Sequence, residues 1–174
     1  MIDNDKITLR ALEPADVDLL YRWENDMEVW KVSNTLTPFS KYTLEEFIKT
    51  SMEDIYTSKQ LRLMIEEKNS QKTVGIIDVF EFDPYHQRAG IGILMDCPAR
   101  NKGYAQEAIS LLIHYLFHVL KLHQIYCNVL IDNEKSLHIF QKAGFKIAGL
   151  KKDWILTDDG YKDEYLLQLI RVEK

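Results

Sequence analysis

The six residues from Arg100 to Ala105, which read R-x-x-G-x-A, constrain this chain more than any other stretch. They stand between an apolar, strand-like run at 91–95 and a long helical run at 103–120. A short loop that opens a helix can bind an anion, because its backbone N–H groups converge and the helix dipole adds about half a positive charge. Strand, loop and helix form such a cradle only in this order. We therefore predict an α/β fold in which this glycine loop (residues 100–105) binds a pyrophosphate.

A second block with its own spacing lies further along the chain. It reads N-x-x-S from Asn133 to Ser136 and then K-x-G-F from Lys142 to Phe145. Together the two blocks resemble the GNAT superfamily of N-acetyltransferases, most closely the bacterial spermidine N-acetyltransferases and the ribosomal-protein N-terminal acetyltransferases. The resemblance extends from Ile7 to Ile170, and it implies that the glycine loop binds acetyl-CoA.

Apolar periodicity predicts one α/β (α+β) domain over residues 1–174, built on a mixed sheet. The expected strands lie at 7–12, 61–66, 73–82, 88–95, 124–131, 146–156 and 161–172. Helices are expected to begin at Glu13, Thr43, Gly103 and Asn133, with Thr43 as an N-cap that Glu46 completes as a capping box. This gives about seven strands and about four helices. The resemblance implies that the sheet is splayed between its fourth and fifth strands.

Composition and charge exclude several classes of function. A net charge of −5 and a pI near 5.6 argue against nucleic acid as the principal partner, and they mildly favour a cationic substrate. The chain shows neither a leader pattern nor an apolar run long enough to span a bilayer, so we expect no membrane and a cytoplasmic location. Cys97 and Cys127 suit that reducing compartment as packing residues. His114 and His118 are four residues apart but have no evident third ligand, so we expect no metal.

The resemblance assigns the cofactor to particular residues. The pantetheine arm is expected to enter the splay as though it were an added strand, where a backbone N–H would also face the thioester oxygen. The expected cofactor-binding residues are Ile93, Leu94, Met95, Arg100, Asn101, Lys102, Gly103, Tyr104, Ala105, Asn133, Ser136 and Lys142. Asn133 has a second interpretation, as the N-cap of the helix that follows it, and we expect it to serve both roles.

Two positions depart from the spermidine-type pattern. Phe140 stands where those enzymes carry a tyrosine that protonates the departing thiolate, and Gly90 stands where they carry a glutamate. A positioned general acid contributes about 10²–10⁴-fold, whereas a thiol already leaves as a tolerable anion. The loss therefore predicts slower chemistry or a substitute donor. Tyr104, Tyr126 and an ordered water are the candidates, and the sequence leaves the choice open.

The sequence constrains the acceptor amine less than it constrains the acyl donor. An alkyl amine needs a base at neutral pH far more than an α-amine does, because its pKa is near 10.4 rather than near 7.8. Asp78 and Glu81, on the strand before the cofactor edge, are the best candidates for the base or for a substrate contact. Strand alternation predicts that they face opposite ways, so that at most one serves. The aromatic segment with Trp30 and Asn34 is either a packing loop or part of the substrate pocket.

We therefore expect an acetyl-CoA-dependent N-acetyltransferase in which the amine attacks the thioester directly in a ternary complex. The acceptor would be a polyamine or diamine such as spermidine, or a protein or peptide N-terminal amine. Acidic residues that could attract a polyamine also include Glu24, Asp26 and Glu28. An acyl-CoA-binding protein with little turnover is the alternative, because of Phe140 and Gly90. A homodimer or higher homo-oligomer is possible.

Overall fold

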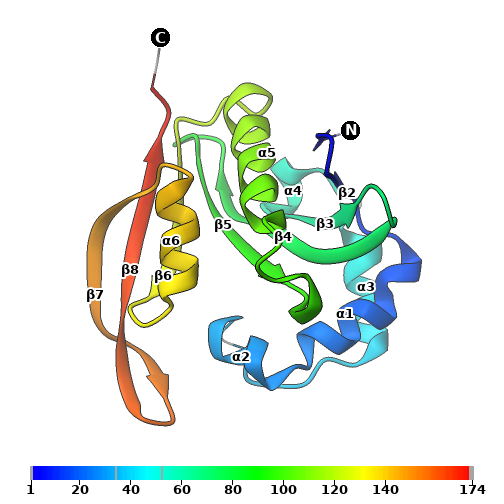
Figure 1. Ribbon diagram of the computed structural model, residues 1–174, viewed down its shortest axis with the longest axis horizontal. Coiled ribbons are helices and arrows are strands. Elements are labelled where there is room, and N and C mark those ends of the chain that lie inside the picture. Colours follow the sequence, from blue (N-terminus) through cyan, green and yellow to red (C-terminus); the bar gives the residue numbers. More distant parts are fainter. Residues whose placement is uncertain (1, 34, 52, 173–174) are drawn as a thin grey trace.

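A computed structural model describes residues 2–33, 35–51 and 53–172, and one mixed sheet runs through them (Figure 1). The strands are β1 (Ile2–Asp3), β2 (Ile7–Arg10), β3 (Leu61–Glu67), β4 (Lys72–Asp83), β5 (Arg88–Met95), β6 (Gln124–Leu130), β7 (Lys146–Thr157) and β8 (Gly160–Ile170). The helices are α1 (Val17–Glu24), α2 (Met27–Ser33), α3 (Lys41–Thr50), α4 (Ile55–Ser58), α5 (Tyr104–His118) and α6 (Glu134–Lys142), with 3-10 turns η1 (Pro14–Asp16) and η2 (Cys97–Ala99). The predicted mixed α/β sheet is confirmed. The described residues add the two-residue β1 and the short α2 and α4 to the expected elements.

The sheet order is β1-β2-β3-β4-β5-β6-β8-β7, and neighbours are antiparallel except for β5 and β6. These two parallel strands pair only from Arg88–Gln124 to Gly90–Tyr126. Beyond that point β5 continues to Met95 and β6 to Leu130, and the ladder between them has ended. The predicted splay is confirmed, and its vertex is the pair Gly90 and Tyr126.

Helices cover the sheet on both faces. On one face α5 and α6 pack against each other and against the sheet, as Figure 1 shows. The apolar pattern of α5 predicted a buried helix, and the structure confirms it: Ala108, Ile109 and Leu112 have no exposed surface. On the other face α1 and α3 enclose a second, smaller core. Its buried members are Leu12, Leu20, Trp23, Leu44, Ile48, Met64 and Ile76. The sheet that opens between β5 and β6 is therefore covered by different helices on its two faces.

The second predicted helix begins earlier than expected. Ser40, rather than Thr43, is the N-cap of α3, and its hydroxyl accepts a hydrogen bond from the Thr43 N–H at 3.0 Å. Glu46 pairs with Lys49 on the helix surface and forms no capping box. The helix ends at Thr50, and Asp54 caps the separate α4 through the N–H groups of two residues that follow it.

A bulge in β4 changes which way its side chains face. The register with β5 shifts between Phe80 and Asp83, and Glu81 takes a left-handed backbone with φ of +50°. Val79 and Phe82 consequently both lie in the core under α5, although strict alternation would put them on opposite faces. The expectation that Asp78 and Glu81 face opposite ways is wrong, because the bulge slips the alternation by one residue.

The C-terminal hairpin matches its prediction. β7 and β8 pair from Lys146–Gln168 to Thr157–Gly160, so that two aspartates form the tip, and Gly160 takes a φ of +109° there. Within the described residues, no helix combines the length and apolar character needed to cross a membrane.

Candidate functional site

The glycine loop follows β5 and is shaped by two left-handed residues. Asn101 has φ of +62° and Gly103 has φ of +84°, with Gly103 in the N-cap position of α5. The first intrahelical bond runs from the Glu107 N–H to the Gly103 carbonyl, so the N–H groups of the first turn have no helical partner. Alternating backbone conformations next to a helix start form a concave set of donors that suits a pyrophosphate. The backbone of the glycine loop therefore has the shape that the predicted anion cradle requires.

Side chains around this loop fix it to the sheet. Asp96 accepts hydrogen bonds from the Trp23 indole at 3.1 Å and from the Cys97 N–H at 3.1 Å. Arg100 donates from Nε to the Met95 carbonyl at 3.2 Å, so this bond ties the loop to the end of β5. Lys102 is exposed and can approach an anion from solvent. We infer that Arg100 shapes the loop at least as much as it adds charge.

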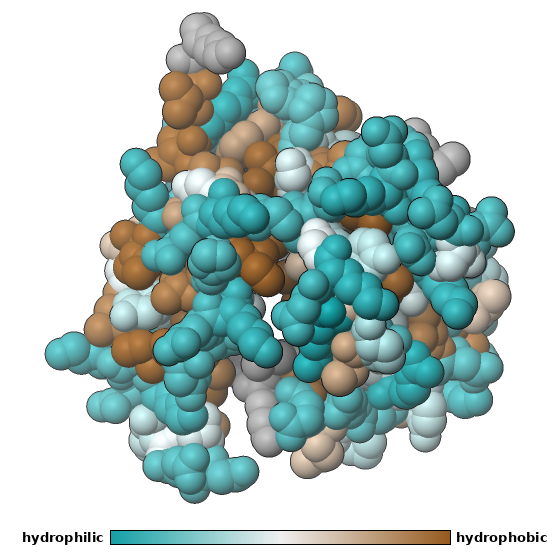
Figure 2. Space-filling view, in the orientation of Figure 1, coloured by the Kyte–Doolittle hydropathy of each residue, from teal (hydrophilic) through white to brown (hydrophobic). Residues whose placement is uncertain are grey.

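Beyond the vertex, β5 presents an edge that can receive an extended ligand. Ile93 and Met95 pack toward the core under α5, while Leu94 packs toward the core under α1 and α3. The side chains are thus committed to packing, whereas the backbone that faces β6 has no ladder partner. Figure 2 shows the surface hollowed between α6 and the glycine loop. The strand is therefore partly buried, and its edge is still available to an extended ligand.

Asn133 caps α6, as its position predicted. Its Oδ1 accepts a hydrogen bond from the Ser136 N–H at 3.2 Å. Lys142 is exposed in the last turn, about 13 Å along the helix from the cap. The structure therefore places Asn133 and Ser136 beside the splay end of α6 and leaves Lys142 at the opposite end.

Phe140 is a core residue. Its side chain is 4% exposed and packs edge-on against Phe145, with ring centroids 5.3 Å apart. A phenylalanine here supplies no proton, and its ring packs among apolar side chains.

Phe140→Tyr is therefore not expected to accelerate the enzyme. The added hydroxyl would enter the apolar core, which costs about 1–3 kcal/mol when no partner is available. We expect an unchanged turnover rate and a lower melting temperature, measured by a thiol-release assay and by calorimetric unfolding. A rate increase of tenfold or more would contradict this placement of the side chain.

Gly90 is required by the ring of Phe80. A Cβ built on Gly90 would stand 2.1 Å from the Phe80 ring, far inside contact distance. The same ring meets Tyr126 edge-on, with centroids 5.9 Å apart and planes at 90°. An aromatic side chain from β4 thus occupies the space that a glutamate at position 90 would need. The sequence showed the missing glutamate but gave no sign of this replacement.

Tyr126 and Glu81 meet at the vertex. The Tyr126 hydroxyl donates a hydrogen bond to a Glu81 carboxylate oxygen across 45 positions of sequence. Burial and this carboxylate both raise the pKa of Tyr126. The bulge at Glu81 makes the contact possible. Both residues were candidates from the sequence, and the structure brings them together.

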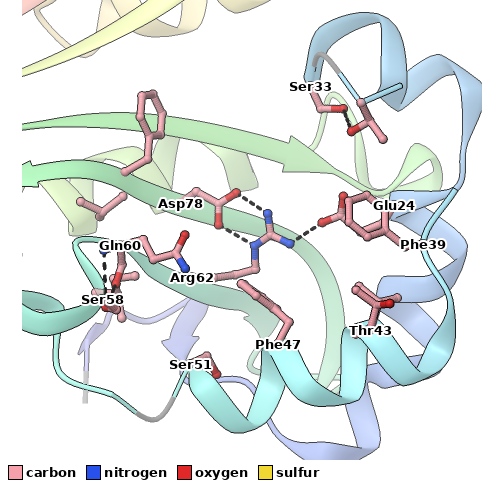
Figure 3. A pocket seen from close by; sticks show the side chains of 15 residues that line it. Glu24, Ser33, Phe39, Thr43, Phe47, Ser51, Ser58, Gln60, Arg62 and Asp78 are labelled. Atoms are coloured by element: carbon pink, nitrogen blue, oxygen red, sulfur yellow. Dashed lines mark hydrogen bonds and ion pairs between the residues drawn. The ribbon is translucent and has the colours of Figure 1, made fainter. Parts of the chain in front are cut away.

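An acidic cavity lies on the α1–α3 side of the sheet, next to Phe80, and has a volume of about 380 Å³. At its floor the Arg62 guanidinium is bound to Asp78 by two hydrogen bonds of 2.7 and 2.9 Å and also to Glu24 (Figure 3). Phe47 of α3 covers it, with the ring centroid 5.2 Å from the guanidinium carbon. Although burial lowers the pKa of Arg62, the two carboxylates outweigh it and raise that pKa. Asp78 is therefore paired with Arg62 and forms part of the cavity wall, which disfavours it as a free base.

Sequence reasoning missed Arg62, although a charged residue inside an apolar strand was a usable signal. Two other candidates lie elsewhere. The Tyr104 hydroxyl donates to Glu67 of β3 at 2.8 Å, which directs it away from the splay and disfavours Tyr104 as the substitute acid. Trp30 donates to the Glu24 carbonyl at 2.6 Å and so supports the end of α1. Asn34 lies outside the described residues.

The GNAT acetyltransferase domain profile matches residues 6–146, which is most of the chain. The chain belongs to the GNAT acetyltransferase family. Acetyl-CoA is accordingly its acyl donor, and the glycine loop and the open β5 edge fit that molecule. As a member of this family the chain is an N-acetyltransferase.

Relatives of this GNAT protein include enzymes of known acceptor. It is 26% identical over 171 residues to a spermidine N(1)-acetyltransferase of Vibrio cholerae, with 95% of each chain covered. It is 29% identical over 147 residues to that of Escherichia coli K12, covering 82% of this chain and 74% of the relative. A crystal structure of the Vibrio cholerae enzyme in complex with CoA and spermine superposes with a TM-score of 0.87 at 24% identity, covering 96% of each chain. This last likeness shows the fold.

Proposed function

We propose that this GNAT enzyme acetylates a primary amine of a polyamine or diamine such as spermidine, by direct attack in a ternary complex. The observation that carries the proposal is the acidic cavity beside the vertex. Glu24 and Asp78 share the single guanidinium of Arg62, so two carboxylates and one cation leave a formal charge of −1. Such a site attracts an ammonium group and disfavours an anionic acceptor. The relatives that acetylate spermidine support the same class.

The arrangement suggests how the two substrates meet. Acetyl-CoA supplies a thioester whose carbonyl carbon the amine attacks. The glycine loop and the β5 edge would hold this donor from the α5 side, and the cavity would hold the acceptor from the α1–α3 side. Phe80 lines the cavity and also covers Gly90, so its ring borders both the acceptor pocket and the vertex. Fixing both reactants in this way can contribute several kcal/mol through orientation, on the order of 7 or more in favourable cases.

A thiol-release assay with acetyl-CoA tests the proposal. Spermidine, spermine and short diamines are expected to turn over, with free amino acids much slower because their carboxylates meet the acidic cavity. A peptide with a free N-terminus separates the polyamine class from the N-terminal-amine class. If only the peptide is acetylated, the polyamine proposal is wrong. If acetyl-CoA binds but no amine is acetylated, the chain is an acyl-CoA-binding protein, which the absent tyrosine at Phe140 and the absent glutamate at Gly90 favour.

The same proposal includes two further points: the chain is a single catalytic domain, and it forms homo-oligomers. The apolar side chains Leu150, Trp154, Leu156 and Tyr161 stand 44–69% exposed on the C-terminal hairpin, a surface that suits a second copy. A related spermidine N-acetyltransferase from Vibrio cholerae forms a dodecamer. Light scattering that gave the monomer mass of 20.5 kDa would contradict this part.

A cytoplasmic location suits the free thiols of Cys97 and Cys127.

A further inference from the structure

The hydroxyl of Tyr126 lies at the point where the sheet opens, in a second cavity of about 420 Å³. This vertex cavity is lined by Glu81, Asp83, Arg88, Gln124, Tyr126, Leu166 and Gln168. Tyr126 pairs in register with Gly90, the last β5 residue before the open edge. Its ring contacts Phe80, which also forms a wall of the acidic cavity. Tyr126 is thus adjacent to both the donor edge and the acceptor pocket.

The direction of one hydrogen bond determines what Tyr126 can do. A phenol has one proton, and here Tyr126 donates it to the Glu81 carboxylate. Its oxygen lone pairs are therefore free to accept a further hydrogen bond, while its proton is already committed. A phenol held in this way is a poor donor toward a thiolate but a good acceptor from an ammonium group, with the carboxylate ready to take the phenol's own proton.

We propose that Tyr126 and Glu81 form the proton relay that removes a proton from the acceptor amine. This deepens the proposed function and rests on it. The ammonium nitrogen of the acceptor first gives a proton to Tyr126 Oη, which frees its lone pair. The nitrogen then bonds to the acetyl carbon as the carbon–sulfur bond breaks, and it loses its second proton to water. The Tyr126 proton moves to Glu81, which releases it to solvent. The thiolate leaves with the carbon–sulfur electron pair and takes a proton from water. Tyr126 is then a catalytic residue, and Glu81 acts through it.

The charged neighbours are consistent with this assignment. From β4, Glu81 and Asp83 face Tyr126, and from β5 Arg88 faces it while pairing with Asp83 at 3.5 Å. On the other side β8 contributes Leu166 and Gln168, which carry no charge. Glu81 is exposed, so a proton that reaches it can pass to water. Its left-handed backbone, unusual for glutamate, is the kind of strained conformation that persists at functional sites.

Two conservative variants test the relay. Tyr126→Phe keeps the ring contact with Phe80 but removes the hydroxyl, and Glu81→Gln keeps a hydrogen-bonding side chain that cannot take the proton. With an alkyl amine at pH 7 we expect turnover to fall about 100-fold in each, with an unchanged Kd for acetyl-CoA. The deficit should shrink as pH rises toward the amine's own pKa, and it should be smaller for an acceptor of low pKa. Tyr85→Phe, at a tyrosine 87% exposed outside the site, is the matched control and should not change turnover.

A second measurement needs neither acetyl-CoA nor turnover. In protein labelled at tyrosine Cζ, the resonance that Tyr126→Phe removes should shift when the carboxylate partner is protonated in acid. That step should be absent in Glu81→Gln. An equal loss at every pH and for every acceptor would overturn the relay, as would a Glu81→Gln variant as active as the wild type. A wild type that acetylates no amine would contradict the proposed function instead, and the acid-dependent shift would then still report on the pair.

Discussion

Replacing Arg62 with methionine is expected to lower the free energy of unfolding by about 3–5 kcal/mol. The change leaves Glu24 and Asp78 without their shared cation, although their side chains are only 11% and 27% exposed. A carboxylate that loses its partner in such a place keeps its desolvation cost. Urea unfolding followed by circular dichroism measures the loss, and the variant should also bind acceptor amines differently because the cavity gains negative charge.

The sign of the pH dependence gives an independent check. In Arg62→Met each unpaired carboxylate favours its neutral form in the folded protein, because burial penalises an unpartnered charge. Protonation then stabilises the folded state, and the deficit should shrink as pH falls through the acid range. Lys49→Met is the matched control, because it breaks the Lys49–Glu46 pair, whose side chains are 69% and 46% exposed. That change should cost far less stability, because an exposed ion pair is screened by water and salt. Equal losses from the two variants would show that the Arg62 cluster behaves as a surface pair.

Gly103→Val is expected to weaken acetyl-CoA binding about 100-fold, which corresponds to about 2.7 kcal/mol. Within the protein a Cβ at Gly103 meets no atom within 4 Å, so the fold has room for it. The valine would instead strain a left-handed position and put a side chain where the pyrophosphate approaches the backbone donors. Titration calorimetry with acetyl-CoA and with CoA measures the effect.

Gly160→Val separates the two causes of that loss. Gly160 also has positive φ and open space around it, but it is the first residue of β8, directly after the turn from β7. It should lose comparable stability, about 1–2 kcal/mol from backbone strain, and keep its affinity for acetyl-CoA. Unchanged binding by Gly103→Val, or an equal loss of binding in Gly160→Val, would rule out the glycine loop as the donor site.

Local signals account for what sequence reasoning predicted well. The glycine loop, the buried α5 and the Asn133 cap each depend on residues within one or two turns of chain. The error at α3 has a local cause as well, because Ser40 and Thr43 are both good caps. The chain resolves that competition by using the Ser40 hydroxyl for the Thr43 N–H.

The acceptor side depends on contacts between distant parts of the chain. Arg62 lies 38 positions from Glu24 and 16 from Asp78, and Tyr126 lies 45 from Glu81. A one-residue bulge decides that Glu81 shares the side of Tyr126, and period-two patterning cannot show such a slip. The missing tyrosine at Phe140 was visible in the sequence, whereas its burial against Phe145 was not.

By itself, then, the sequence determined the donor half of this enzyme, because a strand, a glycine loop and a helix in that order form an anion site from neighbouring residues. Only the tertiary structure decided the acceptor half. Side chains of α1, β3, β4 and β6 meet there after folding, and the bulge at Glu81 sets which of them face one another. Packing and register, which are properties of the whole sheet, therefore determine where the proposed acceptor site and the proposed proton relay lie.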